Sequence, residues 1–393
     1  MKASYDSVDV RGRRVLVRED LNVPLRDGRV ADDTRIEAAI PTLKDLSSRG
    51  ARVIIASHLG RPRGMPDPAY SLKPVAERLA KLIGIEVAFA SDCIGEPARV
   101  AVEGLAEGGL LLLENVRFHR GEEANEPGFA AALAAHADLF VNDAFAASHR
   151  AHASVVGVAA RLPAYAGKLM LAELEALHRA LDQPARPLVA IVGGAKVSSK
   201  AGVLRFLLPR VDRLLIGGAM ANTFFKARGL EVGSSFVEDA ALDEALRVES
   251  EAGGKLLLPV DAVCAQKMEA GQKTRVCAVA NVEPGWMMLD LGPESIREFA
   301  AAVKGAGTVV WNGPPGVFEI SEFSAGTRAL GEAVAGSGAF TLVGGGDTAA
   351  AVEALGLAGR FSHVSTGGGA TLEYMEGREL PGVAILTELE VAR

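Results

Sequence analysis

Short runs of apolar residues alternate with longer segments of mixed polarity along the whole chain. Within each run the apolar residues are continuous, which is typical of parallel strands that helices cover on both faces. The alternation of strands and helices predicts an α/β fold. Ligands of such sheets bind beyond the carboxyl ends of the strands, so the residues after each run are candidates for a site. The runs lie at 15–17, 53–56, 110–113, 139–141, 189–192, 214–216, 255–259, 308–311 and 340–343.

The length of the chain and one long helical segment predict two domains. The chain has 393 residues, and single hydrophobic cores stop growing at roughly 250–300 residues. Segment 163–182 carries apolar residues at positions 170, 174, 177 and 181, a spacing that gives one apolar helical face, and prolines follow it. We expect this helix to link the two domains.

Composition narrows the class of protein. The net charge of −7 argues against a nucleic-acid surface. No apolar run approaches the roughly 18 residues that span a bilayer, and the first residues lack the apolar segment of a secretory signal. Three cysteines, Cys93, Cys264 and Cys277, are odd in number and lack CxxC spacing. We expect reduced, mostly buried thiols in a cytoplasmic protein, rather than a nucleophilic cysteine.

Residues 339–356 combine a buried strand, three glycines at 344–346, Asp347 and an alanine-rich helix. Free backbone N–H groups and the helix dipole at such a helix start favour a phosphate, and glycines let the backbone approach it. Asp347 would then hold a Mg²⁺ bound to that phosphate. The alternative is that Asp347 only caps the helix. The local pattern leaves both interpretations open.

The first half of the chain places cationic side chains in or near the loops after its strands. Arginine matches carboxylate and phosphate groups, so the set predicts a pocket for a small, highly negative molecule. Each residue taken singly could instead belong to a solvated basic face. The set comprises Arg18, Arg35, Arg61, Arg117, Arg150, His58, His149 and His152.

Two further features of this half have two interpretations each. Asp20 and Asn22 would share one face of an extended segment and could bind substrate hydroxyls, or they form a polar turn closed by a proline. Arg35 lies in the first turn of a helix that opens at 32–34, where a cation opposes the helix dipole. Either the aspartates at 32 and 33 offset Arg35, or it awaits an anion.

In the second half, Lys196 and Lys200 follow a strand and a glycine turn, which is typical of phosphate binding. Their spacing would bring them together on one helical face, although solvated lysines are the alternative. The small and apolar residues at 217–224 would suit a purine ring. Asn312 and Glu319 could bind a ribose or a nucleotide phosphate, or Glu319 is a surface charge in a turn. A second glycine run, 367–369, also enters a helix.

The P-loop, dinucleotide and protein-kinase fingerprints are all missing from the sequence. Seven other motifs occur in an order that resembles the phosphoglycerate kinase family over nearly the whole chain. Glu19 departs from this pattern, because many members carry an apolar residue there, and we expect the change to be tolerated. The motifs are REDLNVP (18–24), SHLGRP (57–62), SHRAHAS (148–154), GGAKVS (193–198), WNGPPGVFE (311–319), GGGDT (344–348) and STGGG (365–369).

The resemblance implies two doubly wound, Rossmann-like domains that face a cleft. Residues 1–170 would bind the phosphoglycerate, with the tail 378–393 packed back onto them, and residues 171–377 would bind the nucleotide. The implied reaction is reversible, Mg²⁺-dependent transfer of the acyl phosphate of 1,3-bisphosphoglycerate to ADP, giving 3-phosphoglycerate and ATP in glycolysis. A cytoplasmic monomer without nucleic-acid or membrane partners is expected.

The resemblance also assigns residues to roles. The triose would be bound by Asp20, Asn22, Arg35, His58, Leu59, Gly60, Arg61, Arg117 and Arg150. The nucleotide would be bound by Lys196, Lys200, Gly292, Asn312, Glu319, Gly345, Gly346, Asp347 and Thr348, with Asp347 on Mg²⁺. The transferring phosphoryl group would be stabilised by Arg35, Lys196, Gly346 and Gly369.

The chemistry needs no general base, because the accepting carboxylate is already ionised at neutral pH. Catalysis would then come from positioning and from charge stabilisation, with the domains closing to exclude water. Two other functions fit less of the sequence. One is a two-lobed binding protein that captures an anionic metabolite, and the other is a different ATP-dependent kinase or ligase.

Overall fold

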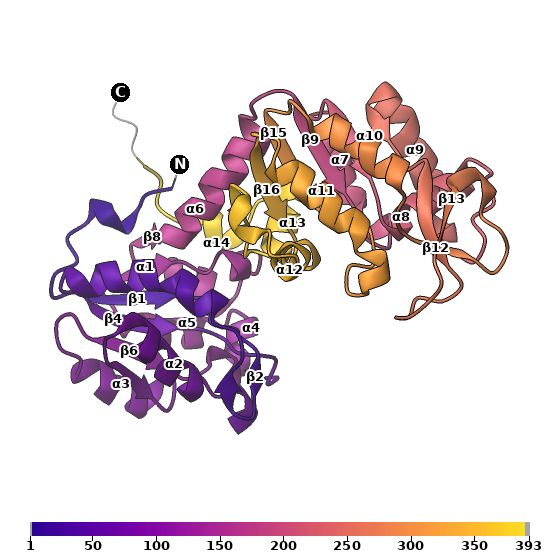
Figure 1. Ribbon diagram of the computed structural model, residues 1–393. Helices are drawn as coiled ribbons and strands as arrows, with labels where there is room; N and C mark the ends of the chain where they lie inside the picture. The colour runs from indigo at the N-terminus through magenta and orange to yellow at the C-terminus, as the bar shows by residue number, and fades with distance from the viewer. Residues whose placement is uncertain (1, 390–393) are drawn as a thin grey trace. The chain divides into compact units, whose positions relative to one another are not determined.

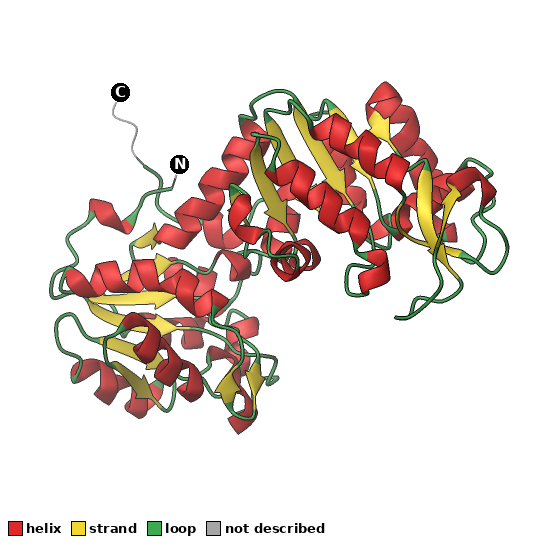
Figure 2. Ribbon diagram, in the orientation of Figure 1, coloured by secondary structure: helices red, strands yellow, loops and turns green. Residues whose placement is uncertain are grey.

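The computed structural model describes residues 2–389 and divides the chain into two compact units (Figure 1). Unit 1 comprises Met1–Leu174 and Glu379–Arg393, and unit 2 comprises Glu175–Arg378. The division falls inside helix α6 (Lys168–Leu177), the helix in which the sequence analysis placed the domain boundary. Each unit contains a parallel sheet flanked by helices (Figure 2).

The sheet of unit 1 has six parallel strands in the order β5-β6-β4-β1-β7-β8. A short antiparallel hairpin, β2 (Leu25–Arg26) and β3 (Arg29–Val30), follows the first strand of this sheet along the chain. The six strands are β1 (Arg14–Arg18), β4 (Arg52–Ala56), β5 (Val87–Ala90), β6 (Leu110–Leu113), β7 (Leu139–Asn142) and β8 (Ala164–Ala166). The helices are α1 (Thr34–Ser48), α2 (Lys73–Ile83), α3 (Gly95–Glu103), α4 (Arg120–Glu123), α5 (Pro127–Ala134) and α14 (Pro381–Ala384).

The apolar periodicity of the sequence explains this packing. All four leucines of β6 are buried, as expected for a central strand with helices on both sides. Helix α1 turns Ile36, Leu43 and Leu46 into the same core, at helical spacing. Each such side chain, once removed from water, contributes roughly 1.5–3 kcal/mol to the hydrophobic term. The core therefore fixes which strand ends come together.

The main sheet of unit 2 repeats the plan, with six parallel strands in the order β11-β10-β9-β15-β16-β17. Those strands are β9 (Leu188–Val192), β10 (Arg213–Ile216), β11 (Leu256–Leu257), β15 (Thr308–Asn312), β16 (Phe340–Gly344) and β17 (His363–Val364). The helices are α7 (Ala201–Leu207), α8 (Ala219–Ala227), α9 (Leu242–Ala252), α10 (Pro293–Val303), α11 (Ala325–Ala335), α12 (Gly346–Ala354) and α13 (Gly369–Met375).

Unit 2 also holds an antiparallel sheet that the sequence analysis did not predict. It joins β12 (Asp261–Ala265), β13 (Arg275–Ala278) and β14 (Met287–Leu291) in the order β13-β12-β14. The expectation of parallel sheets alone was incomplete. Strand β13 alternates half-buried and exposed residues, so it lacks the continuous apolar run by which the other strands were recognised.

Two predicted elements have different bounds in the structure. Segment 163–182 is not one helix: Ala164–Ala166 forms strand β8, which pairs with β7 before α6 begins. The helix then widens into one π-helical turn, His178–Asp182. The run 255–259 narrows to the two residues of β11, beside β10. In both places the bounds of the strand are set by pairing with a neighbouring strand, and a helical or apolar pattern alone does not reveal that pairing.

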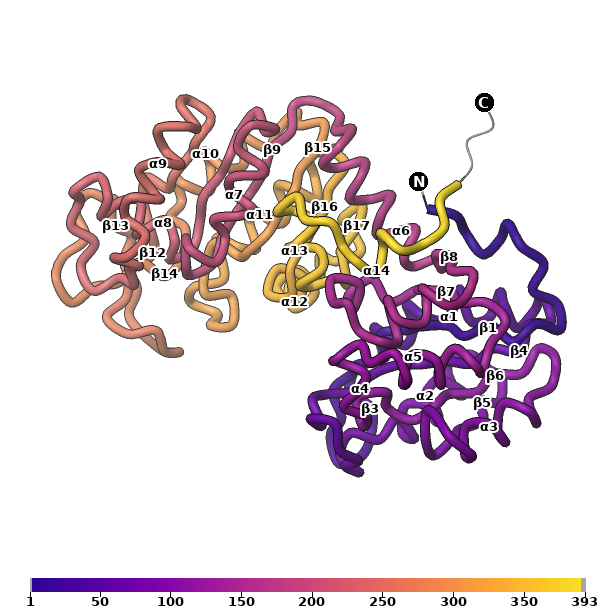
Figure 3. The backbone as a smooth tube through the Cα atoms, turned by 180° about the vertical axis from the view of Figure 1, so that it is seen from behind, coloured from indigo at the N-terminus to yellow at the C-terminus, as the bar shows by residue number. Residues whose placement is uncertain are grey.

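The C-terminal segment packs within unit 1 beside the N-terminus (Figure 3). The Ala3 amide donates to the Thr387 carbonyl oxygen at 2.8 Å, and the Gly382 amide donates to the Ser148 carbonyl oxygen at 2.8 Å. A Cβ at Gly382 would lie 2.5 Å from a methyl carbon of Val155, so only glycine fits there. Of the tail predicted at 378–393, residues 390–393 lie outside the described residues.

No helix within residues 2–389 is both long enough and apolar enough to cross a membrane. The three cysteines are free thiols, with Cys93 and Cys264 buried and Cys277 half-buried.

Glu19 is fully buried directly after β1, and neither carboxyl oxygen has a hydrogen-bond partner among the described residues. Burial, and then the nearby Asp143, raises the pKa of Glu19 well above its usual range. We expect Glu19→Met to raise the free energy of unfolding at neutral pH by about 1–3 kcal/mol, because it removes an unpaired buried acid while keeping an unbranched shape. Urea denaturation measures this, with Glu19→Gln as the control. A less stable methionine variant would mean that the acid is satisfied.

Candidate active site

A buried arginine and a buried histidine lie at the carboxyl ends of the two central strands of unit 1. Arg18 ends β1, and its guanidinium donates to Ser154 Oγ at 2.8 Å and to His58 Nδ1 at 3.1 Å. An arginine has no acceptor atom, so Nδ1 of His58 must be unprotonated and its proton lies on Nε2. The ring is therefore a neutral donor at Nε2.

The charges around His58 show that the cationic residues of this half converge. The pKa of His58 lies well below its usual range, first because the ring is buried. The remaining causes are the charges of four arginines, Arg18, Arg117, Arg35 and Arg150. His152 behaves in the same way: burial, then three of these arginines, lowers its pKa to about 4. Four arginines that act on one imidazole form a strongly positive cluster, which favours an anion.

Arg35 belongs to this cluster through Asp20. It lies in the first turn of α1, and its guanidinium donates to Asp20 Oδ2 at 2.8 Å. In the alternative interpretation, the aspartates at 32 and 33 offset the charge of Arg35, but neither of them pairs with it. Asp33 pairs with Arg78, and Asp32 accepts hydrogen bonds from the amide and hydroxyl of Thr34. The arginine side chain remains 36% exposed.

The loop after β4 is held in place by hydrogen bonds from several elements. The Gly60 amide donates to Asn22 Oδ1 at 2.8 Å, while its carbonyl oxygen accepts from Arg117 at 2.7 Å. Gly60 has φ 60°, and a Cβ there would lie 2.2 Å from the Tyr70 ring. The backbone oxygen of Leu59 accepts from Asn115. Leu59 and Gly60 thus shape the loop.

The other arginines of the predicted triose site come from three different segments and differ in exposure. Arg61 is exposed and Arg150 is half-buried. Arg117 is buried in the short helical turn Val116–Phe118 and pairs with Glu123 at 3.2 Å. The structure therefore brings Arg35, Arg117 and Arg150 together around His58, whereas Arg61 is exposed beside Gly60 in the loop.

The glycine turn of unit 2 leads directly from β16 into α12. Gly345, with φ 91°, is the N-cap residue, and Asp347 lies exposed in the first turn. The alternative in which Asp347 caps the helix is therefore wrong. Thr348 Oγ1 accepts from the Gly313 amide at 2.6 Å and donates to the Gly344 carbonyl at 3.1 Å. Thr348 holds the turn from inside, while Asp347 points its charge outward into solvent.

Asn312 joins this turn to a lysine. Its Nδ2 donates to the Gly344 carbonyl at 2.7 Å, and its Oδ1 accepts from Lys200 Nζ. Asn312 is fully buried, so it positions the turn and Lys200. Burial lowers the pKa of Lys200, whereas the charge of Asp347 raises it.

Lys196 does not share a helical face with Lys200. It is exposed and precedes the helical turn Ser198–Lys200. The glycine loop before the helix packs closely against the end of β15. A Cβ at Gly193 would lie only 2.5 Å from the Gly313 carbonyl oxygen, and this close packing keeps the loop irregular. The predicted lysine pair at helical spacing is wrong.

A cavity of about 1180 Å³ opens beside these groups within unit 2. Most of its wall is apolar, and the small residues at 218–222 contribute to it, as expected for a flat ring. Glu319 and Asp347 lie on its polar side. The sequence analysis missed the apolar residues Phe236, Met287 and Met288, because two of them come from the unpredicted antiparallel sheet.

The glycines that the resemblance assigned to the nucleotide and to the phosphoryl group differ in burial. Gly292 is buried at the N-cap position of α10, and a Cβ there would lie 2.3 Å from the Asp261 carboxyl carbon. It packs behind Leu291, which lines the cavity. Gly346 and Gly369 are exposed at the first residues of α12 and α13.

The family model for phosphoglycerate kinase matches residues 5–378. The chain belongs to the phosphoglycerate kinase family. A phosphoglycerate kinase of Rubrobacter xylanophilus is 55% identical over 99% of both chains, and a cytosolic one of Nicotiana tabacum is 52% identical over 98% of both. The solved phosphoglycerate kinase of Coxiella burnetii has a TM-score of 0.91 and 44% identity, over 98% of both chains.

These matches confirm the family, the α/β fold with two parallel sheets, and the assignment as a kinase.

Asp290, another residue that lines the cavity, makes a pH-dependent contribution to stability. Burial raises its pKa to about 7, and only its Oδ2 has a partner within the described residues, the Gly326 amide at 2.7 Å. A raised carboxyl pKa adds stability below the unfolded value, near 4, and that stability is lost as the pH rises through about 7.

We therefore expect Asp290→Asn, which resembles the protonated acid, to gain stability relative to the parent protein between pH 5 and pH 8. Near the middle of this window the difference changes by up to about 1.4 kcal/mol per pH unit. Urea denaturation at both pH values measures it. A difference that does not vary with pH would contradict the expectation.

Proposed function

We propose that the chain catalyses the reversible transfer of the acyl phosphate of 1,3-bisphosphoglycerate to ADP, giving 3-phosphoglycerate and ATP. The observation that carries the proposal is the convergence of Arg18, Arg35, Arg117 and Arg150 on the neutral ring of His58. Such a cluster matches a triose that bears several anionic groups. The family assignment makes this triose the expected ligand.

In unit 1, the exposed parts of the cluster would contact the triose, and the buried parts would hold them in place. Arg35, Arg61 and Arg150 retain accessible guanidinium groups for its phosphate and carboxylate. His58 would donate from Nε2, and Asp20 and Asn22 would accept from the hydroxyl group. Asn22 also fixes the Gly60 amide, so loss of its side chain would disturb the loop as well as the ligand.

In unit 2, the apolar cavity would take the adenine ring, with Glu319 near the ribose. Lys200 and the start of α12 would take the phosphates, because a lysine and free N–H groups at a helix start both favour negative charge. Asn312 contributes by holding Lys200 and the glycine turn together. The phosphate end of the nucleotide would thus meet Gly345, Gly346 and Thr348.

The residue that fits Mg²⁺ is Asp347. Its carboxylate is exposed in the first turn of α12, on the polar side of the cavity, and carboxylate oxygens are the ligands that Mg²⁺ prefers. When bound with the nucleotide, the ion would neutralise phosphate charge. The other protein groups of the turn are backbone amides and a hydroxyl, which suits an ion held jointly with a nucleotide.

The transfer itself needs stabilisation of charge rather than a proton acceptor. The carboxylate of 3-phosphoglycerate is ionised at neutral pH, so its oxygen can attack directly. We assign Arg35 and Lys196 the task of stabilising negative charge on the phosphoryl group, aided by the helix starts at Gly346 and Gly369. Because the two reactants are held by different units, transfer requires them to be brought together in the ternary complex.

A coupled assay tests the proposal. The protein is given 3-phosphoglycerate, MgATP, glyceraldehyde-3-phosphate dehydrogenase and NADH, and we expect NADH oxidation that needs every component. A protein that only binds an anionic metabolite gives no oxidation, and a kinase for another acceptor gives none with this substrate. We also propose that the protein is a monomer in the cytoplasm. Light scattering on the purified protein measures its mass and so tests the monomeric state.

A further inference from the structure

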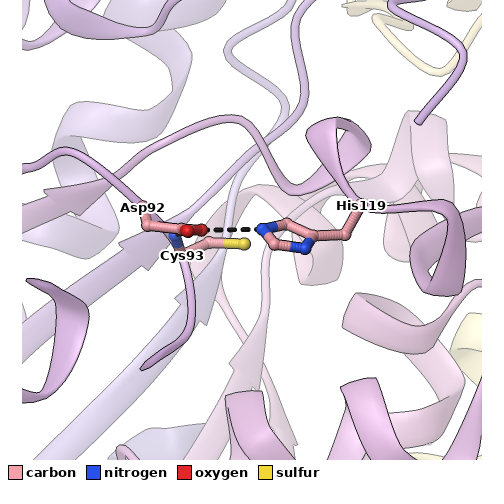
Figure 4. A group of neighbouring side chains, drawn as sticks. All are labelled: Asp92, Cys93 and His119. Carbon is pink, nitrogen blue, oxygen red and sulfur yellow. Dashed lines mark hydrogen bonds and ion pairs between the residues drawn. The ribbon is translucent and has the colours of Figure 1, made fainter. Parts of the chain in front are cut away.

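Asp92, Cys93 and His119 form a compact group of side chains in unit 1, outside the proposed substrate residues. Asp92 and Cys93 follow β5 and precede α3, and His119 stands directly before α4. One ligand atom from each of the three lies within 4.8 Å of the other two. Figure 4 shows the Cys93 sulfur and the Asp92 carboxylate directed at the same edge of the His119 ring.

The three side chains are held by hydrogen bonds within their own group and by packing against its surroundings. The Asp92 carboxylate oxygen Oδ1 accepts from the Cys93 amide at 2.6 Å and from His119 Nε2 at 2.7 Å. The His119 ring stacks on Phe129, with ring centroids 5.2 Å apart and planes 30° apart. Cys93 is fully buried. The donor atoms are therefore held in place before any ligand arrives.

The donor set suits one class of cation. A thiolate, an imidazole and a carboxylate are the groups that bind Zn²⁺, with bonds of about 2.3 Å to sulfur and 2.0–2.2 Å to nitrogen and oxygen. In a tetrahedral site such ligand atoms lie about 3.4–3.6 Å apart. To reach this spacing, the histidine–aspartate contact must open from 2.7 Å, while the three ligand atoms already lie within 4.8 Å of one another. Mg²⁺ prefers oxygen ligands and is disfavoured.

Access to the group is from the side of the histidine and the aspartate. Their side chains are 30% and 39% exposed, whereas the thiol is enclosed. A cation would thus meet water on the open side and the sulfur on the closed side. Three protein ligands with one open position leave room for a water molecule.

We propose that Asp92, Cys93 and His119 form a binding site for a zinc-class divalent cation. On binding, the Cys93 S–H bond breaks, its proton passes to solvent, and a sulfur–metal bond forms without any change of oxidation state. The proton that His119 Nε2 shares with Asp92 moves to Nδ1 by way of solvent, so Nε2 and the Asp92 carboxylate each bond to the cation in place of their hydrogen bond. The cation joins the segment after β5 to the segment that carries Arg117, two residues before His119.

Titration with Co²⁺ tests the site on the full-length protein, without nucleotide or Mg²⁺. We expect one Co²⁺ per chain, with a sulfur-to-cobalt charge-transfer band and the visible bands of tetrahedral cobalt. Zn²⁺ should displace the cobalt, whereas an excess of Mg²⁺ should not. The absence of a charge-transfer band at saturating Co²⁺ would overturn the proposal.

Variants assign the ligands. Cys93→Ser should abolish the charge-transfer band, and His119→Gln, which keeps a hydrogen bond to Asp92, should weaken Co²⁺ binding about tenfold or more. Circular dichroism confirms that each variant is folded. If Cys93→Ser does not fold, the loss of Co²⁺ affinity in His119→Gln tests the site instead.

The controls are Cys277→Ser, a thiol in another part of the fold, and His178→Gln, which removes an exposed histidine that lies 2.9 Å from a carboxylate, Asp182. Both should leave the titration unchanged. A band that survives Cys93→Ser, or that disappears in Cys277→Ser, would place the cobalt elsewhere and refute the site.

Discussion

Arg35→Ala should lower kcat for phosphoryl transfer by about a thousandfold or more, while ADP binding remains nearly unchanged. Arginines that stabilise a transferring phosphoryl group contribute about 10³–10⁵ in kcat. A thousandfold loss corresponds to about 4 kcal/mol of transition-state stabilisation. ADP affinity should persist because the proposed nucleotide groups, Lys200 and the start of α12, lie in unit 2, whereas Arg35 lies in unit 1. Steady-state kinetics and calorimetric titration with MgADP measure the two quantities.

The matched control is Arg78→Ala, since Arg78 binds Asp33 beside the start of the same helix. This variant loses a comparable, partly exposed ion pair and should keep kcat within about twofold, because surface ion pairs contribute only about 0–1 kcal/mol. Arg35→Lys tests whether charge alone suffices, and we expect it to recover part of the activity. An Arg35→Ala enzyme with nearly normal kcat would remove Arg35 from the mechanism.

Asp347→Asn should reduce kcat about a hundredfold and raise the Mg²⁺ concentration needed for half-maximal rate, with no loss of thermal stability. The separation of activity from stability follows from the position of this residue. Gly345 is the N-cap of α12, so Asp347 is not needed to hold the helix. Its remaining contribution is a charge exposed beside Lys200, which suits a metal bound with a nucleotide.

The control for this substitution is Asp239→Asn, an exposed carboxylate that pairs with Lys226 in the same unit. It should change neither the Mg²⁺ dependence nor the melting temperature appreciably. A fall in the melting temperature of Asp347→Asn that matches its loss of activity would support a structural role and contradict the metal assignment.

Local patterns predicted the strands well where both faces are covered. The runs at 110–113 and 214–216 are strands with the same bounds or one residue more, because continuous apolarity and burial have the same cause. The order of strands in each sheet was not predictable in this way. It is set by packing between distant segments, such as β1 between β4 and β7, that no short window contains.

Site chemistry was predictable where it depends on residue type and was missed where it depends on contacts. Five arginines after the strands of unit 1 were expected to meet, and four of them, all but Arg61, act on His58. The partner of Arg35 was not foreseen, because Asp20 lies fifteen positions away on another element. Asn312 was expected to face a ligand, but both of its polar atoms hold the protein itself. Nothing in its immediate sequence distinguishes these two uses.

The meeting of residues 3 and 387 has a consequence for how the polypeptide is made. Unit 2 is one uninterrupted stretch, so its native contacts can form without any residue beyond 378. Unit 1 combines two stretches, so its last backbone pairs can form only after the segment around residue 387 has been synthesised, although most of unit 1 emerges first. The same proximity would allow a linker to join the segments around residues 3 and 387, with the chain reopened in a surface loop.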